Sequence, residues 1–97
     1  MLTVNEFNAI NKKNEKKEAD CIFESAREVI ASAPVGKKSE TIHMQMIKHM
    51  SYCNNHKIYG EDFCRRVGIS FVWGREFTKM RSIHDKLVES GLDCSLI

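Results

Sequence analysis

The amino-acid sequence predicts a small, all-α domain of four to five helices. Apolar residues recur at spacings of three and four along most of the chain, which is the periodicity of amphipathic helices. One short segment, residues 56–59, could be extended, but it has no clear partner strand. With 97 residues, of which 42% are hydrophobic, the chain can form one core and not a second. We therefore expect a helical domain over residues 19–97, preceded by an N-terminal arm or short helix at residues 1–18.

The predicted N-terminal arm has two parts. Thr3 and Glu6 form a capping box, which opens a weak helical turn. Residues 11–18 contain no apolar side chain, so they are a solvated linker or an exposed lead into the next helix. A basic arm lying along a nucleic acid is the alternative. The glutamates between the lysines make this alternative less favoured, because they cancel part of the positive charge.

Two helices are predicted in the middle of the chain. The first ends before Pro34 and Gly36. Its apolar side holds Ala19, Ile22, Phe23, Ala26, Val29, Ile30 and Ala33. The second begins after Ser39 as N-cap and ends at Asn54 and Asn55, which tolerate a left-handed conformation. It is expected to bury Ile42, Met46, Ile47, Met50 and Cys53, with Met44, Met46 and Met50 filling the core.

The cysteines and histidines form no pattern typical of catalysis or metal binding. Cys53 and His56 have a ligand-like gap and Cys64 follows, but a zinc site needs a second close pair, which is absent. We expect four reduced cysteines, with Cys21 the most accessible because it faces away from the apolar side of its helix. His84 lies among apolar positions and is expected to be a hydrogen-bonded core residue. We expect no catalytic residue, no metal and no cofactor.

Charge and hydropathy limit the classes of function without choosing one. The net charge is +2, from 15 basic and 13 acidic residues, so a nucleic-acid footprint would depend on how the charges are distributed. No run of 18 apolar residues is present, and the first residues do not resemble a secretory signal. These observations predict a cytoplasmic protein without a membrane partner.

The C-terminal third begins with a short helix and a tight turn. Phe63, Cys64 and Val67 lie on the inner side of the helix. Glu61 and Asp62 lie in its first turn, where their negative charge interacts favourably with the helix dipole. Gly68 supplies the positive φ that ends the helix. Ile69 then fills the corner, and Ser70 caps a new helix.

Residues 60–79 resemble the helix-turn-helix motif of bacterial DNA-binding proteins. The motif has a small residue where its two helices touch, which Cys64 supplies, and a glycine in the turn, which is Gly68. Phe77 matches the apolar position late in the second helix. Gly74 departs from the pattern, because a β-branched residue usually packs there, and it weakens the helix by about 1 kcal/mol relative to alanine. The resemblance implies a helix-turn-helix within residues 60–90, and the residues after it are too few for a wing.

The second helix of the motif is predicted to run from Phe71 to Ser90, with Gly91 and Leu92 ending it in a Schellman-type turn. Its apolar stripe holds Trp73, Phe77, Met80, Ile83, His84, Leu87 and Val88. The opposite face carries a row at spacings of four, three and four, made of Arg75, Lys79, Ser82 and Lys86. A basic row on an exposed helix suits the major groove of DNA.

The resemblance assigns roles to individual residues. The start of the helix faces bases, and this group is Ser70, Phe71, Val72 and Arg75. Lys79 and Lys86 contact phosphates, and Ser82 lies between them on the row. Arg65 and Arg66, on the outer side of the preceding helix, contact phosphate or are only solvated. The sequence thus predicts a DNA-binding transcriptional regulator of a bacterium or a mobile element, with a homodimer expected because one module makes few contacts. The stripe from Trp73 to Val88 or the helix that carries Phe23 could supply the dimer surface, and nothing in the sequence chooses between them.

Three other interpretations compete with DNA binding. The basic row is also what the solvated side of any amphipathic helix presents. A protein-interaction module is the second alternative, because Phe71, Val72 and Trp73 are consecutive bulky residues that cannot all be buried on one helix face. An enzyme is the least favoured class, since no phosphate-binding loop, metal cluster or activated nucleophile is present in the sequence.

Overall fold

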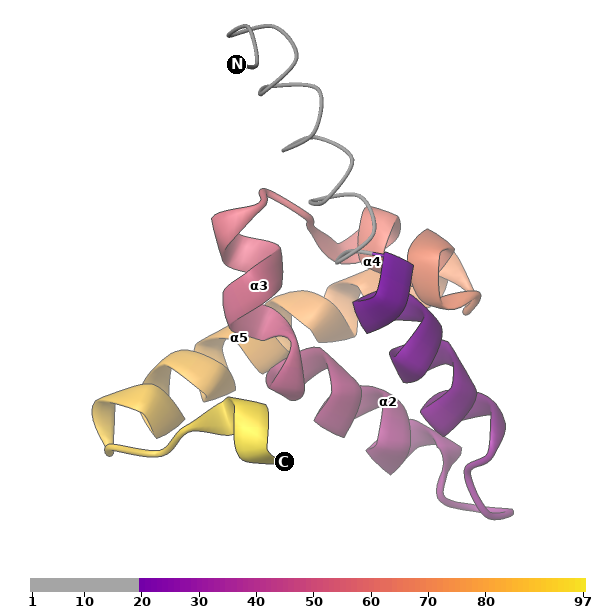
Figure 1. Ribbon diagram of the computed structural model, residues 1–97, viewed down its shortest axis with the longest axis horizontal. Helices are drawn as coiled ribbons and strands as arrows, with labels where there is room; N and C mark the ends of the chain where they lie inside the picture. Colours follow the sequence, from indigo (N-terminus) through magenta and orange to yellow (C-terminus); the bar gives the residue numbers. More distant parts are fainter. Residues whose placement is uncertain (1–19) are drawn as a thin grey trace, which may run out of the picture.

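The computed structural model describes residues 20–97 (Figure 1). The predicted capping box at Thr3 and Glu6, and the arm at residues 1–18, lie outside the described residues. Residues 20–31 are helical. They are followed by α2 (Lys38–Lys48), α3 (Met50–Asn55), α4 (Gly60–Val67) and α5 (Gly74–Glu89), with short 3₁₀ helices η1 (Phe71–Trp73) and η2 (Cys94–Leu96). Within residues 20–97 there are five α-helices and no strand, so the all-α prediction is confirmed.

The core lies where the described helices meet. α5 packs against α2 and α4, and η2 folds back against α2, as the yellow end of the chain shows in Figure 1. Phe23, Phe63 and Phe77 link three helices in series, with ring centroids 6.1 Å apart for the first pair and 5.1 Å for the second. Fully buried aliphatic and sulfur-containing side chains fill the space around them, namely Ile42, Met46, Met50, Cys53, Cys64 and Val67.

The predicted second helix is divided into two. α2 begins at Lys38, so Ser39 lies inside the first turn and the predicted N-cap is wrong; Lys37 occupies that position without a side-chain cap. His49 separates α2 from α3, with φ −100° and ψ 7°. Neither glycine nor proline stands at this break, which is why the pattern of apolar residues predicted one continuous helix.

The end of α3 also differs from the prediction. Asn54 and Asn55 are helical, and the left-handed residue is Lys57, with φ 55°. The N–H of Ile58 donates to the carbonyl of Cys53 at 2.8 Å, as in a Schellman turn. Ile58 is thereby buried in the core. Burial of this side chain decides where the turn forms, even though a lysine must adopt a conformation that favours glycine.

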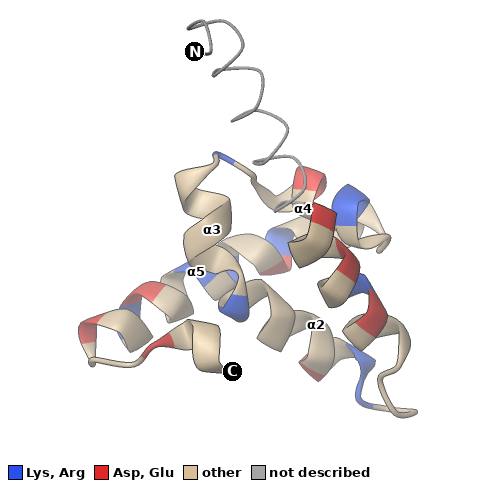
Figure 2. Cartoon of the chain, viewed as in Figure 1, with Lys and Arg blue, Asp and Glu red and all other residues tan. Residues whose placement is uncertain are grey.

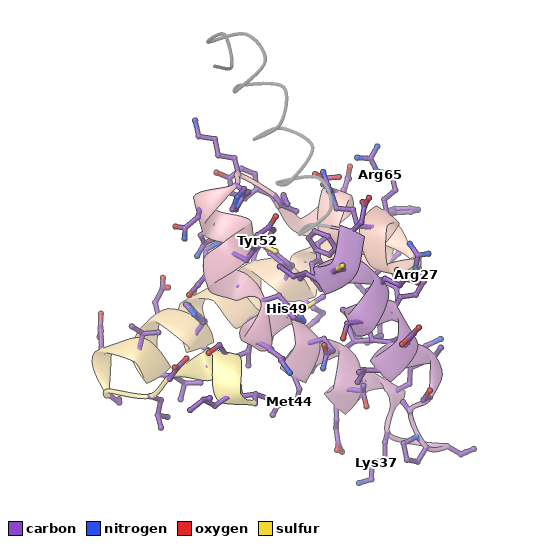
Figure 3. All side chains as sticks on the ribbon, in the orientation of Figure 1. Arg27, Lys37, Met44, His49, Tyr52 and Arg65 are labelled. Carbon is purple, nitrogen blue, oxygen red and sulfur yellow. The ribbon has the colours of Figure 1, made fainter. Side chains whose placement is uncertain are left out.

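Several residues predicted to be buried are exposed. Val29 lies at the solvent edge of its helix, and Met44 faces outward from α2 beside η2 (Figure 3). Ile83 and Val88 are exposed because the C-terminal half of α5 projects beyond the helices that it packs against (Figure 1). Helical periodicity gives the side of a helix that is apolar, but the width of the buried stripe depends on which neighbours cover it.

The structure confirms the predictions for the cysteines and for His84. All four cysteines are free thiols, and Cys21 is exposed while Cys53, Cys64 and Cys94 are buried. Burial raises the pKa of Cys53 to about 12. His84 is buried and its Nε2 lies 3.2 Å from Ser51 Oγ, which confirms a core histidine with a hydrogen-bond partner.

Candidate nucleic-acid interface

The turn between α4 and η1 is built by local hydrogen bonds. Gly68 adopts φ 74° and closes α4 by donating from its N–H to the carbonyl of Cys64. Ile69 N–H donates to the same carbonyl at 2.9 Å. Ser70 then caps the next helix, because its Oγ accepts from Val72 N–H at 3.4 Å. Gly68 and Ser70 therefore play the predicted roles, and the turn fixes the direction of the second helix.

The second helix starts one 3₁₀ turn before α5. η1 runs directly into α5, so the predicted helix from Phe71 to Ser90 is present with a tighter first turn. It ends as predicted: Gly91 has φ 89°, and Leu92 N–H donates to the carbonyl of Leu87 at 3.1 Å. Trp73 turns inward, where its ring lies 5.6 Å from the ring of His43 on α2.

The predicted interface residues of this helix form one exposed face. They come to the surface at Ser70, Phe71, Val72, Arg75, Lys79, Ser82 and Lys86. Thr78 is also exposed and lies next to Arg75 in the same hollow. The structure therefore brings together all the residues that the sequence placed on the helix and adds Thr78 to them.

The positive charges of the row are not equivalent. Lys79 Nζ lies 3.3 Å from Glu76 Oε1, whereas no ion pair joins Arg75 or Lys86 to any residue within 20–97. Glu76 also reaches His43, whose Nε2 lies 3.2 Å from its second carboxylate oxygen. Glu76 lies toward the apolar side of α5 because it pairs with His43 and so links this helix to α2. The sequence alone offers no reason for an acidic residue at this position.

The two arginines of α4 differ from each other. Arg65 projects into solvent (Figure 3) and pairs with Asp62. Arg66 is half-buried: its Nε lies 3.2 Å from Asp62, and its guanidinium lies over the Phe23 ring at 5.3 Å. Arg66 is therefore only partly on the outer side of α4, because the first described helix packs against part of its side chain. Burial would raise the pKa of Asp62, but its hydrogen bonds to Arg65 and Arg66 outweigh that effect and hold the pKa below the usual value.

Arg27 is a basic residue near the turn that the sequence gave no reason to select. Its Nη2 donates to the carbonyl of Arg66 at 2.6 Å, and its side chain passes 3.7 Å from where a Cβ on Gly68 would stand. The contact spans 39 positions in the sequence, so no local pattern could have indicated it. Arg27 braces the end of α4 against the first described helix.

An open hollow of about 680 Å³ lies at the head of α5. Gly60 and Gly74 form part of its wall, and a Cβ on Gly60 would stand 2.7 Å from the carbonyl oxygen of Gly74. Gly60 thus lies where α4 meets the backbone at the start of α5, and the close approach excludes a Cβ on Gly60, whereas a Cβ on Gly74 would meet its nearest atoms at 3.6 Å. The remaining lining residues are Glu61, Phe71, Val72, Arg75 and Thr78.

Charges of both signs surround the candidate interface. Figure 2 shows acidic and basic residues on the first described helix as well as on α5. Glu61 and Asp62 stand at the start of α4, close to the head of α5. Among residues 20–97, no group of three or more His, Cys, Asp or Glu side chains is placed to hold a metal ion, and no helix is long and apolar enough to cross a membrane.

A glycine-closed helix, a tight turn and a long second helix with an exposed polar face define a helix-turn-helix protein. The comparison with known families agrees: the sequence profile of the HTH-like domain matches residues 18–90, and the chain belongs to that family. No curated protein and no solved structure matches the chain.

Proposed function

We propose that this protein binds double-stranded DNA and regulates transcription, acting by binding rather than by catalysis. The observation that carries the proposal is the exposed face of the second helix. It begins at the capped turn and continues through Arg75, Lys79 and Lys86. A helix of this kind fits the major groove, where its first residues meet base edges.

The proposed contacts divide into two kinds. Ser70, Phe71, Val72 and Arg75 are placed at the head of the helix for contact with bases, and the Arg75 guanidinium can bond a guanine at two atoms. Lys79, Ser82 and Lys86 lie further along the row and approach the phosphates. Arg65 is a further phosphate contact, because its side chain is exposed and lines a neighbouring hollow with Glu61 and Phe71. Arg66 is not among the proposed phosphate contacts, because its guanidinium packs over the ring of Phe23.

Glu61 opposes this binding mode. Its side chain is exposed and lines the hollow with Arg75, so it would lie close to the DNA backbone. Removing one like charge from a phosphate-facing surface raises affinity most at low salt. We expect Glu61→Gln to bind duplex DNA about twofold more tightly at low salt than the unaltered protein.

A homodimer on a palindromic site is part of the proposal. One helix-turn-helix offers few phosphate contacts, and two copies joined by a symmetric interface gain affinity together. Of the two surfaces suggested by the sequence, the face of the helix carrying Phe23 is buried within the chain. The exposed Ile83 and Val88 leave the second half of α5 as the candidate surface. Sedimentation equilibrium of the protein with and without Ile83→Ser tests this part.

The test of DNA binding is a fluorescence-anisotropy titration with random duplex DNA at low and moderate salt. The variant is Arg75→Ala/Lys79→Ala. The matched control is Lys37→Ala/Lys38→Ala, which removes the same charge from the start of α2, away from the row, at the lower edge of Figure 3 where Lys37 is labelled. We expect salt-sensitive binding that the first variant loses and the control retains. Equal loss in both variants would show only a net-charge effect, and no binding at low salt would refute the proposal.

A protein partner is the second candidate function. It is favoured by the exposure of Phe71 and Val72, two adjacent apolar side chains beside the acidic Glu61 and Asp62. The same titration discriminates the two: a protein-interaction module does not bind duplex DNA in a salt-sensitive manner, and mutation of Arg75 and Lys79 then has no effect to measure.

A further inference from the structure

Two adjacent apolar side chains stand in solvent at the head of the candidate interface. Phe71 is 71% exposed and Val72 is 61% exposed. Their backbone is held in place on both sides, because Ser70 Oγ accepts from Val72 N–H and Trp73 packs against the core. The protein therefore presents two bulky apolar groups from an ordered helical turn. Their exposure has no explanation within the fold.

These side chains share a face with the basic row. Phe71 precedes Arg75 by four residues, and Arg75 precedes Lys79 by four, so the three are successive neighbours along one side of the helix. Phe71, Val72, Arg75 and Thr78 also line the same hollow. A ligand that covers the apolar pair must approach Arg75 and Thr78 at the same time.

The major groove of DNA offers apolar and anionic groups together. Thymine is distinguished there by its C5 methyl group, which phenylalanine and the methyl group of threonine contact. Phosphates flank the groove on both sides. An apolar peptide would cover Phe71 and Val72 but would leave the cations that continue the row without a counterpart. The apolar pair beside Arg75 therefore favours DNA over a peptide, although Glu61, which also lines the hollow, opposes phosphate.

We propose that Phe71 and Val72 recognise thymine by packing against its C5 methyl group, with Thr78 adding a methyl contact at the edge of the hollow. This inference rests on the proposed function, because it requires the head of α5 to enter the major groove. Gly60 and Gly74 assist by leaving the wall of the hollow without side chains. The protein then prefers sites that place thymine beneath the start of the helix.

The test compares two duplexes that differ only in the methyl group. One is an alternating adenine–thymine duplex, and in the other every thymine is replaced by deoxyuridine. The variant is Phe71→Ala/Val72→Ala, and the matched control is Val29→Ala/Val35→Ala, which shortens two exposed valines away from the hollow. Both substitutions remove exposed side chains, and circular dichroism confirms that each protein is folded.

We expect the unaltered protein to bind the thymine duplex about fourfold more tightly for each methyl group that it buries. The Phe71→Ala/Val72→Ala variant should lose most of this preference and keep only the part that Thr78 contributes, and the control should keep the full preference. Salt-sensitive binding of equal strength to both duplexes by the unaltered protein would overturn the thymine inference and leave DNA binding standing. A preference undiminished in the variant would also overturn it. Binding to neither duplex would refute both proposals and direct attention to a protein partner.

Discussion

The contact between Gly60 and Gly74 allows the two sides of one helix junction to be tested separately. A Cβ added to Gly60 would stand 2.7 Å from the carbonyl oxygen and 2.9 Å from the Cα of Gly74. Both atoms belong to the backbone, so the helices must move apart. A Cβ added to Gly74 would meet its nearest atoms, the nitrogen of Glu61 and the carbonyl carbon of Gly60, at 3.6 Å, an ordinary contact distance.

The two alanine substitutions should therefore change stability in opposite directions. Overpacking costs about 1–3 kcal/mol, and the lower entropy of the unfolded alanine chain offsets only part of it, so Gly60→Ala loses about 1–2 kcal/mol. Gly74 has helical angles, φ −57° and ψ −35°, so Gly74→Ala gains up to about 1 kcal/mol of helix propensity. For a domain of this size, each kcal/mol shifts Tm by about 4–8 °C.

Urea denaturation measures both free energies of unfolding. Trp73 is the chain's one tryptophan and reports on the junction by fluorescence, while circular dichroism follows the helices. The slope of the transition should stay the same in all three proteins, so that the midpoint alone reports stability. Equal stability of Gly60→Ala and the unaltered protein would refute the close approach of the two backbones. A loss in Gly74→Ala as large as that in Gly60→Ala would show that the junction tolerates no added atom on either side.

Three further predictions concern other parts of the chain. Lys57→Gly should stabilise the protein by up to about 1 kcal/mol in urea denaturation, because φ 55° favours glycine; a loss would show that the lysine side chain contributes more than its backbone costs. Burial, and then the charge of Lys48, lowers the pKa of His49 below 6.5, so the unfolded chain binds this proton more readily than the folded one. Stability should therefore fall as the pH drops below 6.5, and by less in His49→Gln; an equal fall in both proteins would refute the assignment. In the folded protein, a thiol reagent should modify Cys21 rapidly and Cys53 only after unfolding, since Cys53 is buried with a pKa raised to about 12; equal rates would contradict the burial.

The sequence by itself determined the class of the fold and the position of the turn. Gly68, Ser70 and Gly91 act through local backbone geometry, which neighbouring residues alone decide, and all three play the predicted roles. The core side of α4 was equally clear, because Phe63, Cys64 and Val67 repeat at helical spacing. The residues predicted to face a ligand from the second helix share one face for the same reason, although their contact with DNA remains a prediction.

Only the tertiary structure decided which side chains are covered and which are paired. Arg66 is tied to Phe23, Arg27 to the carbonyl of Arg66, and Glu76 to His43, through contacts between residues far apart in the sequence. The close approach of Gly60 to the backbone of Gly74 likewise joins residues far apart in the sequence. The physical reason is the range of the interaction: periodicity and capping depend on residues within a turn or two, whereas burial and pairing depend on which helices meet in space.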